Sequence, residues 1–443
     1  MKKKLLYFLL ILLILLAVAF KALIDRAPII TGFSAKMISS WTMLTNRTQQ
    51  SVEQEELSFF PLNLATNTII PDEKAVVSTF FGFSEQKAIY REGLGSTLVA
   101  DFDENTVKKQ KLTQKILPKN PDTIAWPYGD VLPENTPSNI HLDQLASAVN
   151  KAFDKGKTRA VLICYDTLFL LEKYKQGFDR NTRFLGWSMS KSVTNALIGI
   201  LIKQGKLQLH KPAPVKEWQN DNRKSITLHH LLQMSSGLEW EEDYSTISDA
   251  TVMLYKKGDM GSFALNKPLL FPPDSVWYYS SGTSNILSLI IRRQFKTDQE
   301  YWKFPREALF NKTGMRSMIF ETDASGTFVG SSYTFATARD WARFGLLYLK
   351  KGIFNGQSIF PKGWTEYTAT AARKSQGKYG AQFWLQPKEL PDAPPDTYYA
   401  DGYHGQRVYI IPSKKVVIVR FGLNQKGEFD YNTFVNDILK AID

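Results

Sequence analysis

The sequence is poor in cysteine and histidine, the residues that most often build disulfides and metal centres. It has one cysteine, Cys164, and five histidines among 443 residues. A single cysteine excludes an internal disulfide, and neither zinc-ligand spacing nor an H-E-x-x-H motif is present. Cys164 lies in an apolar, strand-like run, where a thiol behaves as a small hydrophobic side chain. We therefore expect no metal ion and no cofactor.

A nucleic-acid motif is also missing, although the chain is basic. Its formal net charge is +12, from 55 lysines and arginines against 43 acidic residues. The basic residues are scattered along the chain instead of forming blocks. This pattern favours a solvated basic surface with weak attraction to anionic surfaces of the cell envelope, and it argues against a nucleic-acid partner.

A long apolar run occurs at the N-terminus. Residues 1–26 begin with three lysines, and Leu5 to Phe20 is uninterrupted apolar sequence. That length is long for a signal-peptide core and slightly short for a full membrane span. Ala17-Val18-Ala19 could serve as a cleavage site, but we favour an uncleaved signal anchor, and no lipobox cysteine is present. The positive-inside rule then places the rest of the chain in the cell envelope, either anchored and facing outward or periplasmic or secreted.

Composition divides the remaining chain into three parts. Residues 27–116 form an extension in which 87–100 reads as a hairpin turned at Gly93-Leu94-Gly95. Residues 117–139 are rich in proline and read as a linker. The main domain is predicted at 140–443, beginning near Ile140.

Hydrophobic patterning predicts an α+β main domain with an antiparallel sheet that joins early and late strands. Residues 160–174 read as a hairpin turned at Asp166-Thr167, and the segment at 238–272 reads as an irregular, aromatic lid or substrate wall. The other expected elements are strands at 406–411 and 415–422 and helices at 226–234, 284–295, 336–350 and 431–442.

The stretch from Phe184 to Gln204 is the strongest candidate for chemistry. Ser188 opens a helix whose apolar residues have helical spacing, and Lys191 follows on the same face. A serine needs a neighbouring base to act as a nucleophile, and burial can lower the pKa of a lysine enough to make it that base. S-x-x-K also occurs at Ser84 and Ser375, but only in polar, turn-like sequence.

Two further motifs follow along the chain. Tyr279 stands two residues before Ser281 in a turn ahead of a helix, and a phenol near a lysine can have a lowered pKa and relay a proton. Gly402-Tyr403-His404-Gly405-Gln406 leads into a strand, and glycine there permits close backbone approach to a ligand.

In this order the three motifs resemble those of the SxxK serine hydrolases, which include class C β-lactamases, penicillin-recognising carboxypeptidases and related esterases and amidases. Residues 226–238, 337–340 and 344–345 are also similar to segments of that family. The forms of the second and third motifs look most like 6-aminohexanoate-dimer hydrolases, and the resemblance covers about residues 120–443. It implies a β-lactamase/transpeptidase-like fold, with an antiparallel sheet flanked by helices and an inserted helical region.

The resemblance also implies roles for individual residues. Ser188 would be the acylated nucleophile, while Lys191 and Tyr279 would share the acid–base work in an order that stays open. Ser281 would hydrogen-bond Lys191 or the substrate, and the backbone N–H groups of Ser188 and Gln406, beside Gly405, would form the oxyanion hole. The third motif usually begins with lysine or histidine, whereas Tyr403 takes that place here and leaves the role of His404 open.

The sequence therefore predicts a serine hydrolase that cleaves a small-molecule amide or ester and contacts the membrane through its N-terminal segment. One alternative is a β-lactamase or a cell-wall D,D-peptidase. The alternative from another class is an inactive, membrane-tethered binding protein.

Overall fold

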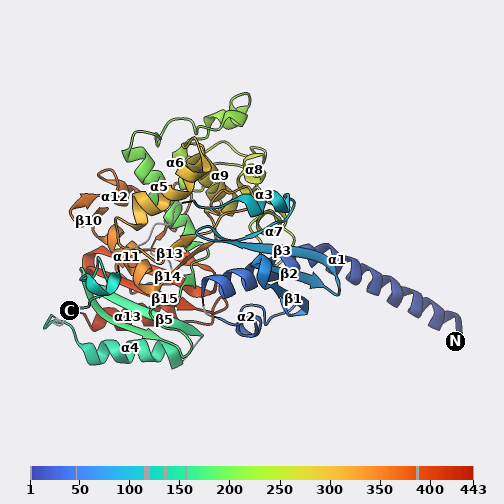
Figure 1. The fold of residues 1–443 in the computed structure, drawn as a ribbon, viewed down its shortest axis with the longest axis horizontal. Coiled ribbons are helices and arrows are strands. Elements are labelled where there is room, and N and C mark those ends of the chain that lie inside the picture. The colour runs from blue at the N-terminus through green and yellow to red at the C-terminus, as the bar shows by residue number, and fades with distance from the viewer. Residues whose placement is uncertain are drawn as a thin grey trace.

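The computed structural model describes residues 2–45, 47–113, 120–133, 137–154, 157–385 and 389–442. Its centre is a six-stranded antiparallel sheet that joins early and late strands, as predicted. The strands follow the order β12 (Trp384–Leu385), β13 (Tyr398–Gly402), β14 (Gln406–Ile411), β15 (Val416–Gly422), β5 (Thr158–Tyr165) and β6 (Leu168–Tyr174) (Figure 1). The predicted hairpin at 160–174 is confirmed as β5 and β6, which pair directly.

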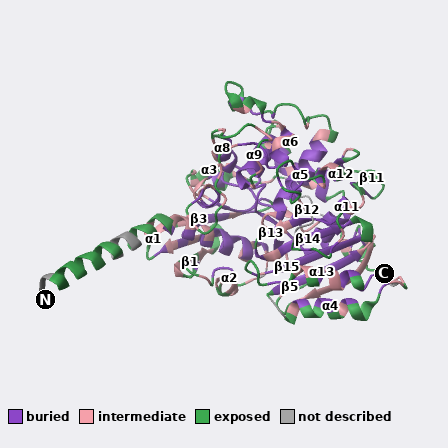
Figure 2. Ribbon diagram, turned by 180° about the vertical axis from the view of Figure 1, so that it is seen from behind, coloured by how far each residue is buried: buried purple, intermediate pink, exposed green. Residues whose placement is uncertain are grey.

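The middle strands are apolar on both faces because helices cover both sides of the sheet. In β15 every residue is buried, and alternate side chains enter different cores. Val416 and Ile418 face α4 (Leu142–Asp154) and α13 (Tyr431–Lys440), whereas Val417 and Val419 face the core that contains α11 (Ala338–Leu349) and α5 (Met189–Lys203). Cys164 is buried in this second core, as predicted. Figure 2 shows the sheet as a buried layer between these helices.

A helical region lies beyond the α5 side of the sheet (Figure 1). It contains α6 (Leu228–Leu232), α7 (Asp249–Lys256), α8 (Met260–Leu265), α9 (Ser281–Arg292), α10 (Asp298–Pro305) and α12 (Trp364–Thr368). The expectation that residues 238–272 are irregular is wrong in part, since α7 and α8 lie within them. Ser248 and Thr251 form a capping box that starts α7, a short-range signal that aromatic content had obscured.

The N-terminal segment is built on a single helix, α1 (Lys2–Leu44), and a four-stranded antiparallel sheet. The strands are β1 (Ala65–Ile70), β2 (Ala75–Phe80), β3 (Phe83–Arg91) and β4 (Gly95–Leu98), and the predicted hairpin at 87–100 is confirmed by the pairing of β3 with β4. Two short helices, α2 (Gln49–Glu55) and α3 (Glu104–Lys109), complete this part. Two small sheets elsewhere comprise β7 (Phe184–Leu185), β9 (Thr334–Ala336) and β8 (Ile319–Phe320), and β10 (Ile353–Phe354) and β11 (Gln357–Ser358).

The two halves of α1 differ sharply in burial. Its first half projects from the body and is exposed, and α1 is the one helix among the described residues that is long and apolar enough to cross a membrane (Figure 1). Its second half, from Ala27 to Leu44, belongs to the main hydrophobic core. Lys36 on this half forms a buried ion pair of 2.5 Å with Glu321 beside β8. Buried residues of the extension expected at 27–116, from Ala27 to Leu98, thus share one hydrophobic core with the main domain.

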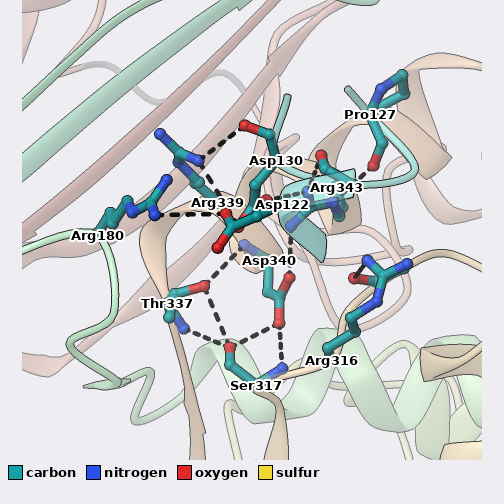
Figure 3. A network of polar contacts seen from close by, with 12 residues as sticks. Asp122, Pro127, Asp130, Arg180, Arg316, Ser317, Thr337, Arg339, Asp340 and Arg343 are labelled. Carbon is teal, nitrogen blue, oxygen red and sulfur yellow. Dashed lines mark hydrogen bonds and ion pairs between the residues drawn. The ribbon is translucent and has the colours of Figure 1, made fainter. Parts of the chain in front are cut away.

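Residues 120–133, which belong to the segment expected as a linker, are fastened to α11 (Figure 3). Arg343 donates from Nε to the Pro127 carbonyl at 2.6 Å and from Nη2 to Asp130 at 2.5 Å. Arg339 on the same helix pairs with Glu172 of β6 at 2.5 Å. Arg343 and Arg339 thus tie residues 120–133 to α11 through Asp130, and Arg339 also ties α11 to β6, an edge strand of the sheet.

Candidate active site

The loop between β7 and α5 fixes Ser188 in place. Gly186 donates its N–H to the Thr334 carbonyl at 2.8 Å, and a Cβ at Gly186 would lie 2.5 Å from the Trp341 ring. Ser188 occupies the N-cap position of α5 with φ −63° and ψ −9°. The prediction that it opens this helix is confirmed. Its hydroxyl does not cap the helix, however, and instead accepts a hydrogen bond from the Lys191 Nζ at 3.1 Å.

Lys191 sits at the centre of the polar contacts. Its buried Nζ donates to the Oγ atoms of Ser188 and Ser281, at 3.1 and 3.0 Å, and to the Ser331 carbonyl at 3.1 Å. Burial lowers the pKa of Lys191 to about 8, although the carboxylates of Glu242 and Asp401 act in the opposite direction. An appreciable fraction of this amine is therefore neutral near neutral pH and can accept a proton. The predicted contact between Ser281 and Lys191 is present.

Tyr279 approaches Ser188 from the turn ahead of α9. Its hydroxyl is directed toward Ser188, its ring lies 4.7 Å from the Lys191 Nζ, and it stacks on Trp384 at a centroid distance of 5.4 Å. Burial and the charge of Glu242 raise the pKa of Tyr279 well above its ordinary value. The sequence had raised the idea of a phenol with a lowered pKa. The structure shows the reverse, so Tyr279 carries its proton.

Two site residues were missed from the sequence, and both come from the segment at 238–272. The Ser281 hydroxyl donates to Glu242 Oε1 at 2.5 Å, and the Ser281 N–H donates to Oε2 at 2.8 Å. The Tyr244 hydroxyl lies 3.0 Å from Ser281 Oγ and donates to Glu242 at 2.8 Å. The only signal in the sequence is that residues 238–272 are rich in acidic and aromatic side chains. That composition does not distinguish Glu242 and Tyr244 from their neighbours.

The third motif reaches the nucleophile through its first residues. A Cβ on Gly402 would lie only 2.1 Å from the Gly186 carbonyl, so only glycine allows β13 to approach the nucleophile loop this closely. Tyr403, the next residue, lines the same cavity as Ser188, and its ring meets Trp187 edge-on at 5.8 Å.

The later residues of this motif lie elsewhere. Gln406 Nε2 donates to the carbonyls of Tyr403 and Gly422, at 2.9 and 2.8 Å, which ties β14 to β15. Gly405 has a φ of 80°, and a Cβ there would meet the Tyr431 hydroxyl at 2.2 Å. His404 is buried, and burial lowers its pKa to about 3. The structure thus brings Ser188, Lys191, Tyr279 and Ser281 together but does not place the side chains of His404 or Gln406 with them.

A cavity of about 170 Å³ opens beside Ser188. Aromatic and aliphatic side chains make most of its wall, and Tyr244, Ser332 and Tyr403 supply polar atoms near the nucleophile. The other two S-x-x-K serines are not among its lining residues, and the ammonium of Lys87 is paired with Glu73 and Glu104 at 2.7 Å each. Among the residues that the structure describes, no cluster of three or more His, Cys, Asp or Glu side chains could hold a metal ion.

Comparisons with known proteins agree with this geometry. Residues 160–433 match the family model described as Beta-lactamase. The chain is 24% identical over 316 residues to the 6-aminohexanoate-dimer hydrolase of Paenarthrobacter ureafaciens, covering 63% of this chain and 77% of that protein.

Solved structures show the same fold. A protein of Bacillus anthracis that carries the provisional name 6-aminohexanoate-dimer hydrolase superposes with a TM-score of 0.56 at 24% identity, covering 66% of this chain and 80% of that one. A penicillin-binding protein of Bacillus halodurans superposes with a TM-score of 0.51 at 17% identity, covering 66% and 98%. Because the family model spans more than half of the sequence, the chain belongs to the Beta-lactamase family, whose fold and hydrolase character it shares.

Proposed function

We propose that this serine hydrolase cleaves an amide or ester through an acyl-enzyme on Ser188. The observation that carries the proposal is the 3.1 Å contact between Ser188 Oγ and the Nζ of Lys191, whose pKa burial lowers to about 8. This chemistry requires a base within hydrogen-bond reach of the nucleophile, and the pKa of that base should lie near the working pH.

In the first step, neutral Lys191 accepts the Ser188 proton while Oγ bonds to the substrate carbonyl carbon. The carbonyl oxygen becomes an oxyanion that needs fixed N–H donors. The N–H of Ser188, at the start of α5, is one donor. For the second we propose the N–H of Tyr403 instead of that of Gln406, because Gly402 brings residue 403 against the nucleophile loop and Tyr403 lines the cavity.

Collapse of the oxyanion breaks the bond to the leaving amine or alcohol, which must gain a proton. Tyr279 holds its proton and lies beside Ser188 and Lys191, so we propose that it gives that proton to the leaving group and recovers one from the Lys191 ammonium. Water then attacks the acyl carbon, loses its proton to the same pair, and Ser188 Oγ leaves with a proton restored.

The relatives narrow the substrate proposal. One of them is named for hydrolysis of the 6-aminohexanoate dimer, a linear amide, and we extend that substrate class to this chain as a proposal. The alternative of a β-lactamase or cell-wall D,D-peptidase rests on the penicillin-binding relative of the same fold. An inactive binding protein is disfavoured, because binding alone does not require Ser188, Lys191 and Tyr279 to meet.

A labelling experiment tests the acyl-enzyme. Incubation with a fluorophosphonate should add one adduct to the intact protein, mapped by peptide mass to Ser188. Ser188→Ala should lose both labelling and turnover without unfolding, since its hydroxyl packs little. Ser84→Ala, which removes the serine of another S-x-x-K copy, should change neither. An adduct on Ser84 or Ser375 would refute the assignment, and a stable adduct with labelled penicillin would favour the alternative.

We further propose that residues 1–26 anchor the enzyme and that its catalytic part faces outward from the membrane. The three N-terminal lysines and the exposed apolar half of α1 support this orientation. A C-terminal alkaline phosphatase fusion should be active. An inactive alkaline phosphatase fusion, together with an active cytoplasmic reporter fusion, would show that the catalytic part faces the cytoplasm.

A further inference from the structure

One wall of the catalytic cavity is made by the helix that carries the apolar N-terminal run. Four residues of α1 line the cavity, Arg26, Ile29, Ile30 and Phe33, and their spacing places them on one face of the helix. Phe33 stacks on Trp187, the residue before the nucleophile, at a centroid distance of 6.0 Å. One continuous helix therefore carries both the exposed apolar run and one wall of the cavity beside Ser188.

The helix geometry sets how far the cavity lies from a bilayer. A helix rises 1.5 Å per residue, so Leu5 to Phe20 spans roughly 24 Å, close to a hydrocarbon core of about 30 Å. Arg26 follows Phe20 by roughly 9 Å and Ile30 by roughly 15 Å on the same scale. With the apolar run inserted, the cavity opens at or just above the headgroup layer.

Exposed aromatic side chains lie on segments that pack against α1. Phe60, Phe81 and Phe83, which we call the aromatic collar, are 73%, 63% and 38% exposed. The Thr31 hydroxyl of α1 donates to the Ser84 carbonyl at 2.7 Å and thereby holds the β2–β3 turn against the helix. Figure 1 shows these strands beside the projecting part of α1. Exposed rings around an apolar helix suit insertion into the interfacial layer of a membrane.

The cavity itself suits an acyl chain. Its wall joins Ile29, Ile30 and Phe33 of α1 with Phe59, Leu62 and Leu254, and Arg26 is its one charged lining residue. Its volume of about 170 Å³ is similar to the ~150 Å³ cavity that holds a six-carbon ring in another protein. About six carbons of a chain thus fit beside Ser188, and a longer chain continues along α1 toward the membrane.

From these observations we infer that the substrate is a membrane amphiphile, a long-chain acyl ester or N-acyl amide that reaches Ser188 from the bilayer in which α1 inserts. This inference rests on the proposed function and specifies its substrate class. Ser188 Oγ would bond to the acyl carbonyl carbon, the headgroup alcohol or amine would leave with a proton, and water would release the fatty acid.

The first experiment compares chain lengths with the full-length chain in nanodiscs of phosphatidylethanolamine and phosphatidylglycerol. Burial of each methylene favours the longer chain by roughly fourfold. We expect kcat/KM for p-nitrophenyl octanoate to exceed that for the acetate by at least about tenfold. Equal or faster acetate hydrolysis would overturn the inference and leave the proposed function standing. Loss of all ester hydrolysis together with absence of fluorophosphonate labelling would refute both.

The second experiment separates membrane delivery from catalysis. Phe81→Asp/Phe83→Asp removes two collar rings that do not line the cavity. Its acetate hydrolysis in solution should match the parent, which also shows that the variant folds. Its hydrolysis of p-nitrophenyl dodecanoate embedded in the nanodiscs should fall by at least about tenfold, because the membrane no longer buries one or more aromatic rings.

A control is Ile353→Asp, which places one aspartate on an apolar site of β10 whose exposure lies between those of Phe81 and Phe83, on the opposite side of the molecule from α1 (Figure 1). It should keep both rates. Unchanged dodecanoate hydrolysis in the collar variant, or an equal loss in the Ile353 variant, would overturn membrane delivery. The single variant Phe81→Ser serves as the milder test if the double variant does not fold.

Discussion

At the scale of single residues, Lys191 balances burial against nearby carboxylates. Burial lowers its pKa, and Glu242, which is hydrogen-bonded to Ser281, raises it again. The balance at about 8 keeps part of the amine neutral at physiological pH and leaves the conjugate acid strong enough to return its proton. Glu242 and Asp401 therefore limit how far burial lowers the pKa of this base.

This balance predicts a pH dependence with a definite sign. Only neutral Lys191 accepts the Ser188 proton, so kcat/KM should rise with pH through an apparent pKa of about 8. Glu242→Gln removes a negative charge that raises this pKa, so the rising limb should move to lower pH. The neighbouring Glu241→Gln changes an exposed carboxylate and should leave the limb in place. A limb that stays fixed or moves upward in Glu242→Gln would contradict this account.

Tyr279→Phe should lower kcat by roughly a hundredfold, the usual scale for a lost acid–base group, with a smaller effect on KM. The ring keeps its stacking on Trp384, so the change isolates the hydroxyl that contacts Ser188. Tyr379→Phe removes a hydroxyl from the adjacent ring of the same cluster and should keep kcat near the parent value. Near-normal turnover in the Tyr279 variant would assign the proton transfer to Lys191 alone.

The sequence predicted Ser188, Lys191, Tyr279 and Ser281 because each stands at a fixed offset inside a recognisable local motif. Glu242 could not be predicted in this way, since its partner Ser281 lies 39 residues away and no local spacing connects them. The register of the third motif also depends on a contact between distant segments. Whether residue 403 or 406 faces the nucleophile depends on the contact between Gly402 and Gly186, which belong to distant segments.

At the scale of elements, periodicity located most of the catalytic core. Apolar patterns typical of a strand or of a helix predicted the strands at 406–411 and 415–422 and the helix that begins at Ser188. The role of α1 was not accessible in this way. A continuous apolar pattern does not reveal that the helix extends to Leu44 and becomes a wall of the cavity.

The attachment of α1 to the body depends on a buried ion pair. Lys36 lies 4.1 Å above the Tyr333 ring, and its partner Glu321 also accepts hydrogen bonds from Ser40 and the Ser96 N–H. Lys36→Met would leave a buried carboxylate without its cation and should lower the free energy of unfolding by about 3–5 kcal/mol in denaturant titrations of the full chain.

Two further variants of α1 test this value. Lys36→Met/Glu321→Gln removes the stranded charge and should recover part of the loss. Lys21→Met makes the same change in an ion pair that is largely exposed and should cost less than about 1 kcal/mol. Equal costs for Lys36→Met and Lys21→Met would show that the buried pair does not fasten the helix.

At the scale of the whole molecule, the charges around the site oppose the general basicity of the chain. The net charge is +12, yet the two charged groups that act on Lys191 most strongly are Glu242 and Asp401. Arg407, the nearest cation on β14, is paired with Asp401 at 2.6 Å and Glu389 at 2.9 Å. Arg407 follows Gln406 in β14 and therefore points to the opposite face of the strand, and its guanidinium is occupied by these two ion pairs.

This distribution predicts poor recognition of substrates that present a carboxylate near the scissile bond, as β-lactams do. The third motif offers the neutral side chain of Tyr403, and a charge-assisted hydrogen bond is roughly twice as strong as a neutral one. Glu242 adds repulsion whenever Lys191 is neutral, and the one cation lining the cavity, Arg26, is exposed at its outer end on α1. We expect kcat/KM for p-nitrophenyl esters or linear ω-amino amides to exceed that for nitrocefin by at least about tenfold, the loss of one charged contact. Assays of all three on one preparation decide the matter, because faster nitrocefin hydrolysis would require a carboxylate-binding cation that the site geometry does not provide.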